Sequence, residues 1–140
     1  MLLSKIAGAR IRYTMPNAKR EYDEAGRYLE LKNLTVQQWE LLVSTGRPVE
    51  ITPEFLASIG NSTAIDQATA TRDFPELEAE KRTRVTQQLK SGSIEMPIVL
   101  KNGDTYDLLS GNTRLTALVK AGISPTVLVV DITNSKAVNP

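Results

Sequence analysis

The chain has 140 residues, of which 41% are hydrophobic and 24% are charged, a composition typical of one globular domain. It contains neither cysteine nor histidine, which excludes disulfides, thiolate nucleophiles, zinc–thiolate sites and a histidine base. A net charge of +1, spread evenly over both halves, gives no support to a dedicated nucleic-acid binder. No apolar run approaches a membrane span and no secretory signal is recognisable, so we expect a cytoplasmic protein without membrane contact.

Residues 1–72 predict a mainly helical N-terminal region. The charged segment 17–31 is expected to be helical, although Gly26 lies inside it at some cost in stability. Thr35 followed by Gln38 has the pattern of a capping box, and apolar residues at helical spacing come next. A second helix is therefore expected to begin after Thr35.

The segment from position 46 to 54 predicts a helix end, a strand and a new helix start. Gly46 is placed to end the second helix. Residues 49–51 have the composition of a short strand. Thr52 and Pro53 then have the residue types preferred at the N-cap and at the first helical position.

Small and polar residues fill positions 60–72, which predicts a mobile loop, with a frayed helix as the alternative. A helix capped by Asp73 is expected to follow and to extend to Lys90. Three basic residues cluster on that helix: Lys81, Arg82 and Arg84. They form either a solvated helix face or a contact for phosphates.

The C-terminal third predicts a strand, a hairpin, a second strand, a helix and a third strand. These segments are 97–100, Asn102–Gly103, 106–109, 112–121 and 126–130. Together with the preceding helix they form an expected core over residues 73–135, followed by a tail at 136–140. The predicted fold class is therefore α+β, with this small mixed sheet preceded by the helical region.

The sequence Ser110-Gly111-Asn112-Thr113-Arg114 lies where the second strand passes into the helix. The first N–H groups of a helix have no partners within it and attract anions, while Ser, Thr and Arg side chains can donate to phosphate oxygens. Gly111 permits a sharp turn, and Asn112 or Thr113 can cap the helix. The same residues also suit an ordinary helix cap followed by a surface arginine.

The ordered pattern PIVLKNGDTYDLLSGNTRLTALVKAGISPTVLVV resembles the ParB/sulfiredoxin superfamily. The resemblance covers about residues 82–131 and implies the fold of that core. The chain departs from two branches: sulfiredoxins carry a cysteine at the position of Asn112, and partition ParB proteins carry Arg at the position of Thr113. The closest branch is the free-serine kinases, whose motif is Asp-Gly-His-Thr-Arg, and a fourth branch comprises nucleases of phages and plasmids.

The resemblance to the kinase branch implies that Ser110 to Arg114 hold the phosphates of a nucleotide (ATP, ADP or CTP), with Mg²⁺ as the accompanying ion and no protein metal site. It also implies a catalytic carboxylate near the first core strand, and Glu95 has that position. Glu95 is then either the base that acts on an accepting hydroxyl or an exposed loop residue.

Two functions are consistent with these features. The first is a nucleotide-dependent phosphotransferase that acts on a hydroxyl of a small molecule or nucleic acid. The alternative is a phage- or plasmid-type module that associates with DNA, by binding or nicking, without kinase activity. A homodimer or a protein partner bound through residues 1–72 is expected in either case.

Overall fold

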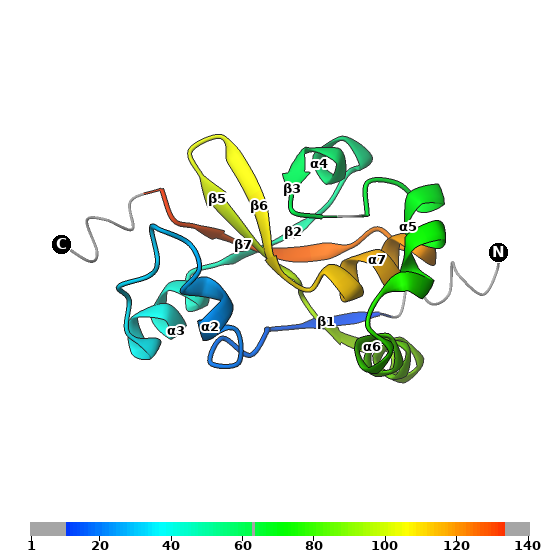
Figure 1. Cartoon of the computed structure of the whole chain (residues 1–140), viewed down its shortest axis with the longest axis horizontal. Helices are drawn as coiled ribbons and strands as arrows, with labels where there is room; N and C mark the ends of the chain where they lie inside the picture. The colour runs from blue at the N-terminus through cyan, green and yellow to red at the C-terminus, as the bar shows by residue number, and fades with distance from the viewer. Residues whose placement is uncertain (1–10, 63, 134–140) are drawn as a thin grey trace.

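The apolar runs of the chain form two sheets flanked by helices in the computed structural model, which describes residues 11–62 and 64–133 (Figure 1). The strands are β1 (Arg12–Thr14), β2 (Arg47–Glu50), β3 (Ile59–Gly60), β4 (Ser93–Glu95), β5 (Ile98–Asn102), β6 (Thr105–Ser110) and β7 (Thr126–Asp131). The helices are α2 (Tyr22–Ala25), α3 (Val36–Ser44), α4 (Pro53–Ser58), α5 (Gln67–Asp73), the 3₁₀ turn η1 (Phe74–Glu76), α6 (Ala79–Ser91) and α7 (Asn112–Lys120). The predicted α+β class is confirmed.

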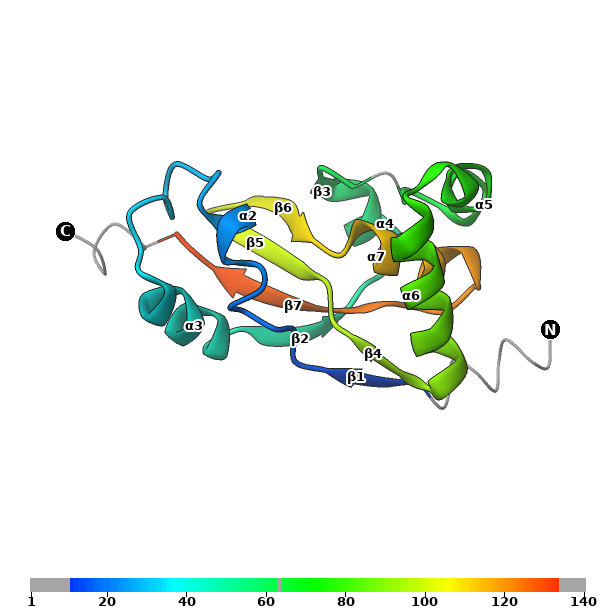
Figure 2. The same ribbon diagram turned by 60° about the horizontal axis from the view of Figure 1, so that its bottom comes forward.

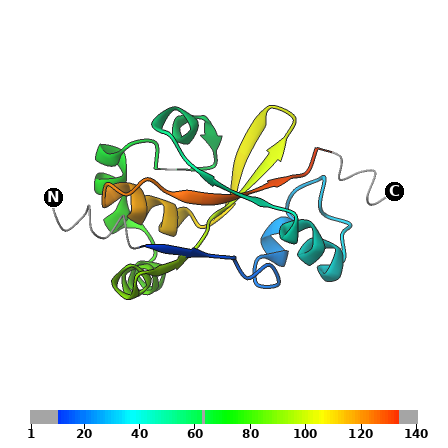
Figure 3. The same cartoon turned by 180° about the vertical axis from the view of Figure 1, so that it is seen from behind.

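The main sheet has the strand order β2-β7-β5-β6-β3. Strands β5 and β6 form an antiparallel hairpin, β7 lies parallel to β5, and β2 lies antiparallel to β7, as the view from behind shows (Figure 3). The predicted order of strand, hairpin, strand, helix and strand is present. The turn falls one residue later than predicted, at Gly103 and Asp104, because Asn102 pairs with Thr105 and Gly103 takes the positive φ of +61°.

Both faces of the main sheet are buried, because its central strands have apolar residues at consecutive positions. On β5, Ile98 and Leu100 pack with Trp39 and its neighbours, whereas Val99 packs on the opposite face with Leu115. The helices α2 and α3 lie at one end of the molecule and α5, α6 and α7 at the other (Figures 1 and 2). The predicted buried strand at 97–100 is thus confirmed.

Two of the capping signals in the sequence, at Thr35 and Thr52, are confirmed. The Thr35 side chain accepts a hydrogen bond from the Gln38 N–H, and the Gln38 side chain accepts one from the Thr35 N–H, which completes the capping box of α3. Thr52 caps α4 in the same way by accepting from the Phe55 N–H. These caps satisfy N–H groups that the helices themselves leave unpaired.

The predicted helix over 17–31 is wrong: only α2 is helical, and successive turns surround it. Tertiary contacts explain the difference. The Tyr22 hydroxyl donates to the Leu34 carbonyl, and the Tyr28 hydroxyl donates to the Leu108 carbonyl at 3.3 Å. These bonds pin the segment against α3 and β6, so tertiary packing overrides the local helical preference.

The loop predicted for 60–72 contains a helix instead, since α5 begins at Gln67. The Asp66 carboxylate caps α5 by accepting from the Thr69 N–H at 2.7 Å, and Ala70 is fully buried. Asp73 ends α5 rather than capping the next helix. Pro75 lacks the N–H that a continuous helix needs, so α6 starts only at Ala79.

The N-terminal region contributes strands as well as helices. Strand β1 pairs in parallel with β4, and β2 and β3 form the two edges of the main sheet (Figure 2). Of these three strands only β2 is expected from the sequence, and it lies two residues earlier at its start than the predicted strand 49–51. The predicted tail at 136–140 lies outside the described residues, and within the described part of the chain no helix is both long and apolar enough to cross a membrane.

Candidate functional site

The junction between β6 and α7 is shaped by an irregularity in the hairpin and by one glycine. Ile98 pairs with Ser110 but Val99 pairs with Leu108, so Leu109 is an extra residue on β6. Such bulges bend a strand and change the direction of the side chains that follow. Gly111 comes next with φ of +93°, a conformation that other residues rarely adopt.

Gly111 is also sterically required. A Cβ atom at this position would lie 2.8 Å from both Cα and Cβ of Pro97 and 2.8 Å from Nη2 of Arg114. The backbone of the turn is therefore packed directly against the start of β5, and the Arg114 guanidinium folds back over it. Gly111 therefore allows the sharp turn that the sequence predicts. Because it has no side chain, it also leaves room for the Arg114 guanidinium.

The predicted cap of α7 by Asn112 or Thr113 is wrong. Gly111 is the N-cap, and no side chain caps the helix, because glycine has none to offer. The first carbonyl bond of the helix runs from the Leu115 N–H to the Gly111 oxygen at 2.8 Å. The N–H groups of the first turn therefore have no partner inside the helix and give this end a partial positive charge.

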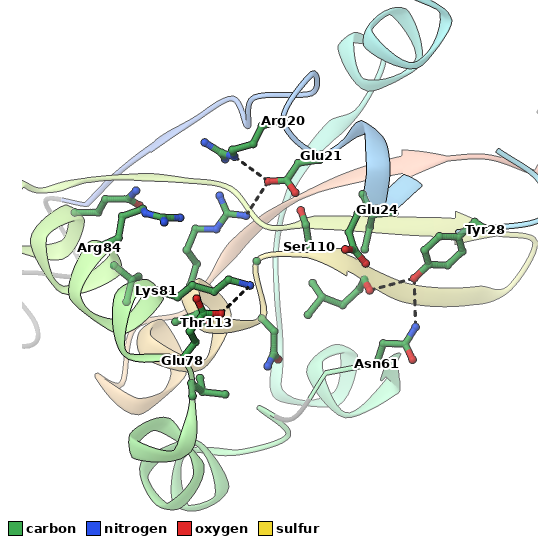
Figure 4. A pocket seen from close by; sticks show the side chains of 18 residues that line it. Arg20, Glu21, Glu24, Tyr28, Asn61, Glu78, Lys81, Arg84, Ser110 and Thr113 are labelled. Carbon is green, nitrogen blue, oxygen red and sulfur yellow. Dashed lines mark hydrogen bonds and ion pairs between the residues drawn. The ribbon is translucent and has the colours of Figure 1, made fainter. Parts of the chain in front are cut away.

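A cleft of about 590 Å³ opens at this end of α7 (Figure 4). It is within the usual size of small-molecule sites. Its lining comes from α2 and the turns around it, the residue after β3, α6 and the two residues before it, β6, and the start of α7. The lining residues are Arg20, Glu21, Glu24, Tyr28, Asn61, Leu77, Glu78, Lys81, Arg84, Val85, Gln88, Leu108, Leu109, Ser110, Gly111, Asn112, Thr113 and Arg114. All five residues of the predicted motif are thus brought to one cleft.

The basic cluster predicted on α6 divides between the cleft and a structural contact. Lys81 and Arg84 line the cleft on the side opposite Tyr28 and Asn61 (Figure 4). The Lys81 ammonium lies 4.0 Å from the Glu78 carboxylate, whereas Arg84 has no ion-pair partner among the described residues. Arg82 instead donates from Nε to the Leu77 carbonyl at 2.8 Å, close to the start of α6.

Arg114 is not the surface arginine of an ordinary cap, because only 12% of its side chain is exposed. Its Nη1 donates to Glu95 Oε1 at 3.2 Å, and its Nη2 lies 4.0 Å from Glu21 Oε2. Burial lowers the pKa of Arg114, against the opposing effect of the two carboxylates. An arginine nevertheless remains charged at neutral pH, so Arg114 is a fixed positive charge beside the helix end.

Glu95 lies beside Arg114 and does not line the cleft. It accepts hydrogen bonds from the Arg20 guanidinium through both oxygens and from the Asn17 N–H at 3.4 Å. Partial burial on its own would raise the pKa of Glu95, but Arg20, Arg114 and the Asn17 N–H together hold it below the usual range. A carboxylate held in its ionised form is a weak proton acceptor.

Two buried polar atoms of cleft residues lack hydrogen-bond partners. They are Ser110 Oγ and Gln88 Oε1, and no other described side-chain atom shares both properties. Polar groups that are buried without a partner are costly, and in native proteins they often mark a functional site or a place for water or a ligand. The hydroxyl predicted to contact phosphate thus has no partner among the described residues, and its oxygen is closed off from solvent in this conformation.

The sequence gives no signal for the wall of the cleft that lies opposite α6. Tyr28 and Asn61 meet there, and the Asn61 amide donates to the Tyr28 hydroxyl at 3.3 Å. Burial raises the pKa of Tyr28. Glu24 projects from α2 into the same side of the cleft (Figure 4). No local motif marks these residues, because contacts between distant segments place them together.

No group of three or more acidic side chains in the described part of the chain could hold a metal ion. Comparison with known protein families gives no matching family model, and neither curated proteins nor solved structures include a significant match to the chain. The likeness to the ParB/sulfiredoxin superfamily therefore remains a prediction from the sequence motifs.

Proposed function

We propose that this protein binds a nucleotide through its phosphates in the cleft at the N-terminus of α7. The observation that carries the proposal is the convergence of three kinds of phosphate partner on one space. These are the first-turn N–H groups behind Gly111, the guanidinium of Arg114, and the unpartnered hydroxyl of Ser110. Backbone donors, a fixed cation and a hydroxyl are the groups that bind phosphate in proteins generally.

Lys81 and Arg84 extend this phosphate site along α6, since both line the same cleft. The cleft as a whole has four basic and three acidic side chains on its lining. Three carboxylates disfavour a nucleic-acid backbone, whose repeated phosphates need an uninterrupted basic surface. The mixed lining suits a compact ligand that has phosphates at one end and hydrogen-bonding groups at the other.

We further propose phosphoryl transfer as the reaction. The oxygen of an acceptor hydroxyl would bond to the terminal phosphorus, the bond from that phosphorus to its bridging oxygen would break, and the hydroxyl proton would pass to a base. Mg²⁺ would enter with the nucleotide, held by phosphate oxygens, and would neutralise their charge. Glu95 as the base remains a prediction, but its lowered pKa and its place off the cleft favour a different role.

The direct test is calorimetric titration of the protein with ATP, ADP and CTP in the presence of Mg²⁺. We expect saturable binding of at least one nucleotide, and a loss of at least about tenfold in affinity for Arg114→Gln, since one charge-assisted hydrogen bond is worth about 1.5 to 3 kcal/mol. Arg72→Gln is the matched control, because Arg72 is an exposed arginine outside the cleft whose ion-pair partner among the described residues is Asp73. Absence of binding by all three nucleotides would refute the proposal.

Chromatography of the nucleotide after incubation with candidate hydroxyl compounds tests the transfer step separately. Conversion of ATP or CTP to the diphosphate only in the presence of an acceptor supports a phosphotransferase. Nicking of supercoiled plasmid without nucleotide turnover would instead support the DNA-associated function that the sequence also allows.

A further inference from the structure

Two arginines and two glutamates form a ring of alternating charge. Two of its members, Arg20 and Glu21, lie at the upper edge of the cleft in Figure 4. Glu95 accepts from Arg114 at 3.2 Å and from the guanidinium of Arg20. Arg20 Nε donates to Glu21 Oε2 at 3.2 Å, and that oxygen lies 4.0 Å from Arg114 Nη2. Each arginine thus lies between the same two carboxylates.

The ring joins parts of the chain that are far apart in sequence. Arg20 and Glu21 precede α2, Glu95 ends β4, and Arg114 is in the first turn of α7. Three of the four line the cleft, whereas Glu95 does not. Glu95 therefore influences a ligand through Arg114 rather than by touching it.

Arg114 needs this support to stay where it is. A buried guanidinium without a partner is strongly disfavoured, and a long flexible side chain can escape to water. Without Glu95 the nearest carboxylate would be Glu21, and its separation of 4.0 Å is too long for a hydrogen bond. Glu95 in turn is held through both of its oxygens by Arg20.

We propose that Glu95 and Arg20 are positioning residues: Glu95 fixes Arg114 at the N-terminus of α7, and Arg20 fixes Glu95. This inference rests on the proposed function, in that the positioned arginine is the one assigned to phosphate. The segment before α2 thereby completes the phosphate site, although it is about 90 residues away from the motif in sequence.

Two other roles for Glu95 predict different effects of its removal on nucleotide binding. A carboxylate that merely neutralises Arg114 would weaken anion binding, so its removal would tighten binding. A general base would affect turnover and leave the affinity for a product diphosphate unchanged. Of the three roles, only positioning predicts weaker binding of ADP when Glu95 is removed, because the Arg114 guanidinium then loses its fixed geometry.

The decisive experiment is a double-mutant cycle on ADP affinity, measured by calorimetry with Mg²⁺ present. Glu95→Gln should weaken binding about tenfold or more, since a guanidinium that is no longer fixed loses its charge-assisted hydrogen bond to the phosphate. In the Arg114→Gln background the same change should alter affinity less than about twofold, because the two residues act as one unit. Arg20→Gln should weaken binding in the same direction, and Glu40→Gln, an exposed residue on α3, is the matched control.

Tighter binding by Glu95→Gln, or the same loss in both backgrounds, would overturn the proposal. A second arm needs no ligand: ¹⁵N relaxation of the Arg114 Nε–H group should show an ordered side chain in the wild type and a mobile one in Glu95→Gln and Arg20→Gln. A well-dispersed backbone spectrum of each variant shows that it is folded. If no nucleotide binds to the wild type, the proposed function fails, and unchanged order of Arg114 in both variants overturns the positioning role independently.

Discussion

Replacement of Gly111 by alanine should destabilise the protein far more than a loop glycine normally would. The backbone at this position has φ of +93°, which costs a residue with a side chain roughly 1–2 kcal/mol. The new methyl group would also lie 2.8 Å from two atoms of Pro97, which must then shift. Overpacking of this kind costs roughly 1–3 kcal/mol. We therefore expect a loss of about 2–5 kcal/mol in the free energy of unfolding.

Gly103 provides the matched control, because it has a positive φ of +61° but nothing within 4 Å of an added Cβ. Gly103→Ala should lose only the conformational part, roughly 1–2 kcal/mol. Urea unfolding followed by circular dichroism measures both variants, and with a slope of about 2 kcal/mol per molar urea the two midpoints should differ by about 1 M. Equal midpoints would show that Gly111 is not packed against Pro97 and that the turn does not fix the site.

The remaining predictions use the same unfolding assay or nucleotide titration. Ser110→Ala should leave stability unchanged or raise it by up to about 1 kcal/mol, since it removes a buried hydroxyl without a partner, and should weaken nucleotide binding; a clear loss of stability would contradict this. Glu95 has a pKa below its ordinary value of 4.5, so its contribution to stability is present above that pH and is lost as the pH falls through the lower, folded-state pKa. Wild type should therefore lose more stability than Glu95→Gln on acidification below pH 4.5, and parallel pH profiles would argue against the ion pairs. Thr35→Ala should cost about 1 kcal/mol through loss of the capping box of α3, and a change below about 0.3 kcal/mol would exclude that role.

Features that depend on a few neighbouring residues could be predicted from the sequence. The capping box of α3, the N-cap of α4, the apolar run of β5 and the β-branched run of β7 are examples. In each case the relevant contacts lie within one element or reflect simple burial. The hairpin turn lies one residue later than the sequence predicts. Asn-Gly is a stronger turn signal than Gly-Asp, but Asn102 pairs with Thr105, so the turn begins at Gly103.

Features that depend on distant contacts could not be predicted. The segment 17–31 has helical composition, yet Tyr22 and Tyr28 bond to carbonyls elsewhere and hold it in turns. For residues 60–72 a loop is favoured over the alternative of a frayed helix, because the Asp66 cap of α5 lies within a stretch of small polar residues that buries little except Ala70. For both segments the local sequence alone does not determine the structure, because contacts with distant parts of the chain decide it.

In the candidate site, too, features set by neighbouring residues could be predicted and features set by distant contacts could not. The residues from Ser110 to Arg114 were identified from the pattern of strand, glycine and helix, and all of them line the cleft. The burial of Arg114 and the ring that holds it were not predictable, because Arg20 and Glu21 come from another part of the chain. A motif can indicate which residues meet a ligand, but the residues that fix their geometry become visible only in the fold.

The measurement that tests the central claim most directly is a titration of ¹⁵N-labelled protein with ADP and Mg²⁺, followed by backbone amide shifts. Binding of phosphate at the N-terminus of α7 predicts saturable shifts that are largest at the amides of Thr113 and Arg114, with smaller shifts at Lys81 and Arg84. The shifts should shrink as salt is raised, because the contact is electrostatic. No shift at millimolar ADP, or shifts confined to residues outside the cleft, would contradict the assignment.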